Sequence, residues 1–108
     1  MQILIQVISS GKQSLRDAII NDPKLDGYNL KVSEYMRPHR SHGWSKLHST
    51  LPDRHGAINI QWDGASMILL CRVVTRGSGK PNLIIGDFVD YLLARFKRRI
   101  QAVNILPR

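Results

Sequence analysis

The sequence contains little cysteine, few acidic residues and no long apolar run. Cys71 is the only cysteine among 108 residues, so the chain cannot form an intrachain disulfide. No apolar stretch approaches the roughly 18 residues that a membrane-spanning helix requires. Residues 1–8 also lack the basic segment and the small-residue cleavage site of a secretory signal. We therefore expect a cytoplasmic protein without a membrane partner.

The shortage of acidic residues leaves the chain strongly basic. Sixteen Lys and Arg residues stand against eight Asp and Glu residues, which gives a formal net charge of +8. Hydrophobic residues make up 43% of the sequence, which is too many for a disordered basic tail and enough for a hydrophobic core. The length fits one domain spanning residues 1–108. A basic domain of this size is suited to polyanions.

Complete catalytic and cofactor motifs are also missing. Ser9-Ser10-Gly11-Lys12 has the position of a phosphate-binding loop, but Gln6 stands where that loop needs glycine. Cys71 lies in the apolar run 67–74, which predicts a buried thiol rather than a nucleophile. We therefore expect no cofactor, and the sequence favours binding over catalysis.

The hydrophobic periodicity predicts strands and helices in alternation, separated by turn-forming residues. Residues 37–56 show little periodicity and are predicted to form an irregular loop. The last helix begins at Pro81–Asn82 or at Asp87, and Tyr91 is expected at the rim of its apolar face. The predicted strands are 2–8, 28–36, 57–62, 67–75 and 100–106, and the first helix is 14–22.

This β-α-β-β-β-α-β order predicts an α+β fold, in which an antiparallel sheet carries two helices on one face. A ferredoxin-like sandwich is the favoured arrangement. The alternative is an α-β-β-β-α core like that of double-stranded-RNA-binding domains. Either arrangement says little about function, because one fold can host many activities.

All four histidines, His39, His42, His48 and His55, fall within the predicted loop 37–56. One hypothesis is a metal site at His39 and His42, although structural zinc sites usually include cysteine. Another is a nuclease or phosphodiesterase that uses His39, His42 and His48 for proton transfer, since histidine titrates near neutral pH. Neither hypothesis is supported by a complete motif.

Basic residues gather in the same loop, in the segment 76–80 and at the end of the last helix. Residues 91–108 contain five Lys and Arg residues and no Asp or Glu, a net +5. Arg, Lys, His and Trp side chains contact phosphates and stack on bases. We therefore expect RNA or DNA as the partner, bound mainly through phosphate contacts. The candidate binding residues are Arg37, Arg40, His42, Trp44, Lys46, Arg76, Lys80, Arg95, Arg98 and Arg99.

A third function class is a protein-interaction or assembly module. In that case an open sheet edge or an exposed Trp44 would join copies of the chain into a homo-oligomer. The sequence leaves RNA versus DNA open, as well as binding versus assembly.

Overall fold

The computed structural model describes residues 2–34, 44–77 and 79–107. Two α-helices, two short 3-10 helices and six strands follow one another along the chain. In order they are β1 (Gln2–Ser9), α1 (Leu15–Ile20), η1 (Leu25–Tyr28), β2 (Leu30–Glu34), β3 (Ser45–Ser49), β4 (Ala57–Asp63), β5 (Ile68–Val74), α2 (Asn82–Phe96), η2 (Lys97–Arg99) and β6 (Ile100–Pro107).

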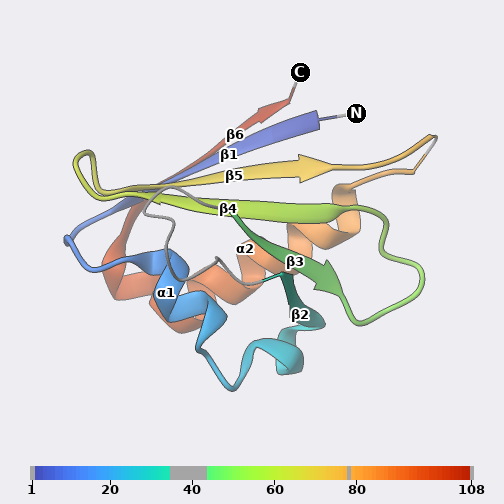
Figure 1. Cartoon of the computed structure of the whole chain (residues 1–108), viewed down its shortest axis with the longest axis horizontal. Coiled ribbons are helices and arrows are strands. Elements are labelled where there is room, and N and C mark those ends of the chain that lie inside the picture. Colours follow the sequence, from blue (N-terminus) through green and yellow to red (C-terminus); the bar gives the residue numbers. More distant parts are fainter. Residues whose placement is uncertain (1, 35–43, 78, 108) are drawn as a thin grey trace.

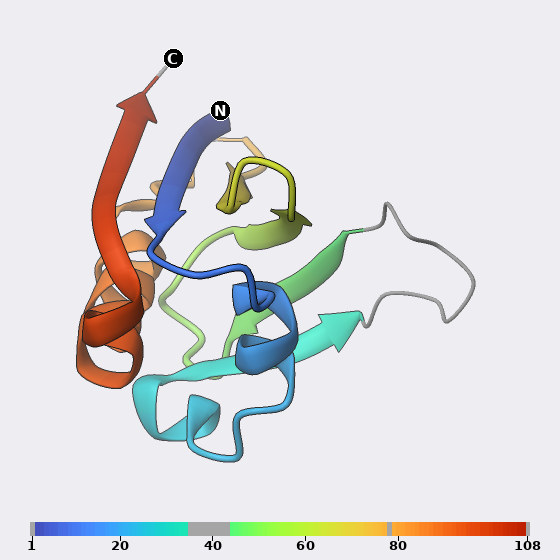
Figure 2. The ribbon, with the colours of Figure 1, turned by 90° about the vertical axis from the view of Figure 1, so that its left-hand side faces the viewer.

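The six strands form one antiparallel sheet in the order β2-β3-β4-β5-β1-β6. Both α-helices lie on the same side of this sheet (Figure 1). Figure 2 shows β1 and β6 side by side, with β2 and β3 at the other end of the sheet and turned strongly away from them. This rotation is the usual twist of antiparallel strands.

Alternation along the strands decides which face the helices cover. In β1, Ile3, Ile5 and Val7 are buried, and each intervening residue is at least partly exposed. Residues that lie opposite one another in an antiparallel pair share a face, so Cys71, the partner of Ile5, joins the same core. The helices contribute buried residues with helical spacing, namely Leu15 and Ile19 from α1 and Ile84, Phe88, Tyr91 and Leu92 from α2.

The opposite face of the sheet, which we call the outer face, has no helix over it in the described part of the chain. None of the side chains that the structure describes on this face is buried. The register places on it Lys31, Glu34, Lys46, His48, Ala57, Asn59, Gln61, Asp63, Ile68, Leu70, Arg72, Val74, Gln2, Leu4, Gln6, Ile8, Ala102, Asn104 and Leu106. An antiparallel sheet can carry helices on one face and leave the other face partly exposed, as the described residues do here.

A buried carboxylate joins the end of α1 to α2. Asp22 accepts a hydrogen bond from the Tyr91 hydroxyl at 2.8 Å and two from Arg95, at 3.0 Å to Nε and 3.2 Å to Nη2. Burial opposes ionisation of Asp22, but the hydrogen bonds from Arg95, the Lys24 amide and Tyr91 outweigh it and lower the pKa of this carboxyl. Burial, together with Asp22, raises the pKa of Tyr91.

Tyr91 corrects one of our expectations. It is fully buried and not at the rim of α2, with its ring edge-on to Tyr28 at 5.4 Å and to Phe96 at 5.7 Å. Its hydroxyl reaches the Asp22 carboxylate, and this contact explains why a phenol can lie in the core.

The predicted α+β class with an antiparallel sheet is confirmed, and the predicted number of strands is wrong. Four strands lie between the two helices, not three, because β3 forms inside the segment 37–56 predicted as a loop. Its inward residues are Ser45, Leu47 and Ser49, so only one apolar side chain marks the strand. Ser14 caps α1, accepting from the Asp17 amide at 3.1 Å, and α2 takes the earlier of its two predicted starts.

Cys71 lies in β5 at 2% exposure, so the expected buried thiol is confirmed. Burial raises the pKa of this thiol, which keeps it protonated and unreactive at neutral pH. Among the described residues, no helix is long and apolar enough to cross a membrane.

Candidate nucleic-acid interface

A hollow of about 670 Å³ lies at one end of the outer face. Outer-face residues of β3, β4 and β5 form its floor, and the β3–β4 loop and the residues after β5 form its walls. We call it the basic hollow; it is lined by Lys46, His48, Arg54, His55, Gly56, Ala57, Asn59, Val74 and Arg76. Five of these nine residues are Lys, Arg or His, and none of the nine is Asp or Glu.

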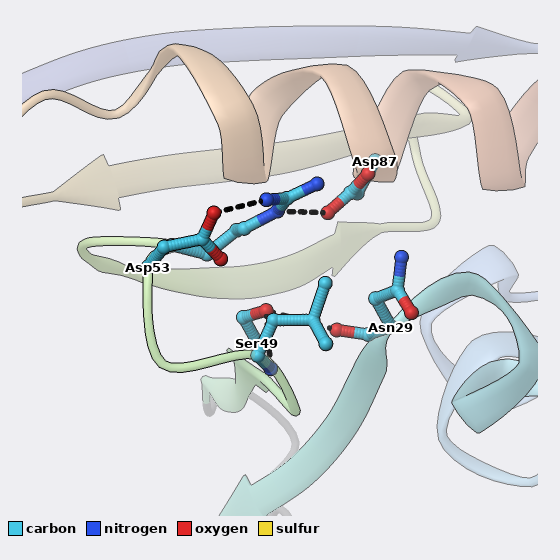
Figure 3. A network of polar contacts seen from close by, with 6 residues as sticks. Asn29, Ser49, Asp53 and Asp87 are labelled. Carbon is cyan, nitrogen blue, oxygen red and sulfur yellow. Dashed lines mark hydrogen bonds and ion pairs between the residues drawn. The ribbon is translucent and has the colours of Figure 1, made fainter.

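The β3–β4 loop that forms one wall is anchored at its start (Figure 3). The Ser49 hydroxyl donates to the Asn29 carbonyl at 3.1 Å and accepts from the Leu51 amide at 3.0 Å. The Thr50 amide donates to the same Asn29 carbonyl at 2.8 Å. These hydrogen bonds attach the start of the loop to the residue before β2. They therefore fix the position of the loop that carries Arg54 and His55.

Arg54 fastens the same loop to α2. Its Nε lies 3.2 Å from Asp87 Oδ2 and its Nη1 lies 2.7 Å from Asp53 Oδ2 (Figure 3). The hydrogen bond to Asp87 is the main reason that the pKa of Arg54 is raised. Because two carboxylates compensate its charge, Arg54 acts as a brace for the loop rather than as the main cation of the hollow.

Gly56 allows the loop to enter β4. Its φ is +103°, and a Cβ built there would lie 2.8 Å from Thr75 Cγ2 and 2.9 Å from the Val74 carbonyl oxygen. Such a conformation is strained for any residue with a side chain. The loop can therefore approach β5 closely only with glycine at this position.

Gly56→Ala should therefore lower the free energy of unfolding by about 1–3 kcal/mol and displace Arg54 and His55. Urea unfolding and amide chemical shifts would measure the two effects. Gly86→Ala, in α2, is the matched control, since nothing lies within 4 Å of its added Cβ. It should be neutral or stabilise the protein by up to about 1 kcal/mol. Equal unfolding midpoints for both variants would contradict the role given to Gly56.

Three basic side chains of the hollow belong to β3 or follow the end of β5. Lys46 and His48 lie on the outer face of β3, where His48 Nδ1 is 2.6 Å from the Ser33 hydroxyl oxygen. Arg76, directly after β5, is exposed and has no ion-pair partner among the described residues. The Lys46 and Arg76 cations at an open hollow favour an anionic ligand, and phosphate is an anion that Lys and Arg side chains bind well.

Trp44 and Arg72 form a pair beside the hollow. The guanidinium carbon of Arg72 lies 5.1 Å from the centroid of the Trp44 ring, a cation–π contact. Trp44 is 37% exposed, and Arg72 is exposed on β5 two residues before Val74 of the hollow. Residues two apart in a strand share a face at roughly 7 Å, so this pair directly adjoins the basic hollow.

The structure brings together only part of the residues predicted to bind nucleic acid. Trp44, Lys46 and Arg76 lie at the hollow or next to it. Lys80 lines a neighbouring hollow with Asp53, His55, Asn82 and Leu83. Arg37, His39, Arg40 and His42 lie outside the described residues.

The helix-end arginines lie elsewhere. Ser10, just after β1, donates its amide to the Arg99 carbonyl at 2.9 Å, whereas Gln2, at the start of β1, pairs with Val74 of the hollow. The two places are thus separated by the length of β1, about 23 Å. Arg95 is engaged with Asp22, and Arg99 donates to the Gln13 carbonyl at 2.9 Å.

The described residues give little structural support to the metal-site and nuclease hypotheses, which both depend on histidine. No group of three or more His, Cys, Asp or Glu residues could hold a metal ion there. His48 Nδ1 lies 2.6 Å from the Ser33 hydroxyl oxygen. The proposed metal ligands His39 and His42 lie outside the described residues.

Two contributors were missed by sequence reasoning. Arg72 belongs to the apolar run 67–75, where it looks like a single interruption, although period-two alternation places it on the outer face with Leu70 and Val74. His55 lay within the histidine-rich window, but only the path of the β3–β4 loop brings it into the same hollow as Lys46 and Arg76.

No protein-family model, curated protein or solved structure matches the chain.

Proposed function

We propose that the chain binds nucleic acid on the outer face of its sheet. The observation that carries the proposal is the basic hollow, where Lys46 and Arg76 line an open depression beside exposed Arg72. Phosphates suit such a site because guanidinium and ammonium groups donate several charge-assisted hydrogen bonds to their oxygens.

The distribution of carboxylates supports this assignment. Five of the eight acidic residues belong to α1, α2 or the segment between α1 and β2: Asp17, Asp22, Asp26, Asp87 and Asp90. The negative charge therefore lies mostly in the helix layer, away from the outer face. A polyanion approaching the outer face meets the more positive side of the molecule.

We also infer that the fold is a ferredoxin-like sandwich with an added edge hairpin. The elements β1-α1-β4-β5-α2-β6 repeat the β-α-β-β-α-β succession of that arrangement, and β2 and β3 extend the sheet beyond β4. In the residues that the structure describes, this arrangement leaves one face of the sheet without a helix (Figure 1).

Binding to a polynucleotide should weaken steeply with salt. Three or four phosphate contacts on a single strand imply a slope of log K against log salt of about −2 to −3. Affinity should then fall roughly 20- to 50-fold between 50 and 200 mM salt. Fluorescence anisotropy with a labelled mixed-sequence oligonucleotide would measure the slope. Affinity that does not change with salt, or no binding to RNA or DNA at low salt, would overturn the proposal.

A further inference from the structure

Side-chain amides lie on the outer face without a hydrogen-bond partner in the described part of the chain. Gln61 of β4 stands opposite Leu70, Leu70 opposite Gln6 of β1, and Gln6 opposite Asn104 of β6. We call Gln61, Gln6 and Asn104 the amide row. An amide both donates and accepts, which suits the edges of bases, whereas phosphate oxygens only accept.

Trp44 stands at one end of the amide row, and its partner Arg72 lies in the next row of the sheet, opposite Asn59. Trp44 precedes Ser45, whose partner on β4 is Ile60, so the register places Trp44 at the level of Gln61. Bases that are not paired stack on aromatic rings and on guanidinium planes. The basic hollow adjoins the same pair, because Lys46 and Asn59 lie opposite one another in the next row of the sheet.

We propose that the ligand is a single-stranded nucleic acid, with bases stacked on the Trp44–Arg72 pair and directed to the amide row. Its phosphates lie in the basic hollow. This inference rests on the proposed function and narrows it. In a duplex the base faces are already stacked and the Watson–Crick edges already paired, so the ring and most of the amides would gain nothing from binding.

The test compares one 12-nucleotide sequence as single-stranded RNA, as single-stranded DNA and as the duplex of each. Trp44→Ala should weaken binding of a single strand about 5- to 150-fold, the usual effect of losing a stacking platform. Trp44→Phe should retain much of the affinity, because it keeps an aromatic face. Duplexes should bind more weakly than single strands, and Trp44→Ala should not change their affinity.

Tryptophan emission gives a second readout. The sequence has two tryptophans, and Trp62 packs against the core, so the difference between wild type and Trp44→Phe isolates the emission of Trp44. A single strand should quench this difference signal, and a duplex should leave it unchanged. Arg72→Lys keeps the charge but loses the planar contact, so it should lower affinity without changing the salt slope.

The outcomes separate this inference from the proposed function. If Trp44→Ala binds single strands as the wild type does, or if duplexes bind equally well, the single-strand inference fails while salt-sensitive binding stands. If no polynucleotide binds, both fail. Circular dichroism and the urea midpoint of Trp44→Ala establish that the variant is folded. If Trp44→Ala is unfolded, the single-strand inference is tested by two other results. These are the quenching of Trp44 emission, obtained with Trp44→Phe, and the affinity of Arg72→Lys for single strands.

Discussion

Replacing Asp22 by asparagine should lower the free energy of unfolding by about 2–3 kcal/mol at neutral pH. The Asp22 side chain is 3% exposed and accepts from Tyr91 and twice from Arg95, and an amide cannot satisfy all of these donors. The Arg95 side chain is 32% exposed, so solvent screening reduces the value below that of a fully buried ion pair. Urea unfolding monitored by circular dichroism measures the loss.

The same substitution should change the response to acid. The pKa of Asp22 is lowered in the folded state, so its ion pair contributes stability above the unfolded-state pKa, near 4. The difference between wild type and Asp22→Asn should be constant above about pH 5. It should shrink as the pH falls through the lowered folded-state pKa.

Asp26→Asn is the matched control for this prediction. Asp26 is exposed, belongs to the same acidic segment, and its carboxylate has no ion pair among the described residues. Its substitution should change stability by less than about 0.5 kcal/mol. If both variants unfold at the urea concentration of the wild type, the Asp22 network adds no net stability, and Arg95 is then free to be considered for ligand contact.

The double reversal Arg72→Glu with Arg76→Glu should weaken polynucleotide binding about 100-fold or more at low salt. Each arginine is exposed at or beside the basic hollow, so the change removes two positive charges near the phosphates, one of which also belongs to the stacking pair, and adds repulsion. The magnitude of the salt slope should fall by about 1.4, since each contact to a single strand contributes about 0.7. Anisotropy titrations at several salt concentrations give both quantities.

Lys97→Glu with Arg98→Glu alters net charge by the same amount at the other end of β1. Both residues are exposed in η2. If binding occurs at the outer face, this control should retain most of the affinity, apart from a small long-range term that salt screens. If instead the control loses as much as the Arg72 and Arg76 variant, the helix-end arginines carry the contacts, as the sequence clustering suggested.

Much of the fold could be predicted because the periodic spacing of apolar residues marks most of the helices and strands. Ile3, Ile5 and Val7 mark β1, and Phe88 and Leu92 mark α2. In contrast, β3 puts Ser45 and Ser49 on the side of the core, so the period-two signal depends on Leu47 alone. A strand with polar inward residues is recognised only once its neighbours β2 and β4 are placed.

The sequence named Lys46, Trp44 and Arg76 as candidates, but it could group them into one site only where they are close along the chain. Lys46 shares a window with Trp44, and that clustering pointed to both as contacts, whereas the neighbouring His48 was named only for proton transfer. Arg76, which follows β5, joins them only because β4 and β5 pair and bring Val74 opposite Ala57. Arg95 shows the opposite error. Its basic neighbours in the sequence suggested a ligand contact, but in the structure it pairs with Asp22, which is 73 residues away.

The burial of Cys71 in β5 makes the protein convenient for spectroscopic labelling. Its thiol is shielded and protonated, so maleimide reagents should leave it unmodified in the folded protein. A cysteine introduced at an exposed position such as Ser66, in the turn between β4 and β5, would then be the sole reactive thiol. A donor fluorophore there and an acceptor on an oligonucleotide end would give the direction in which a bound strand crosses the sheet, with the native cysteine left in place.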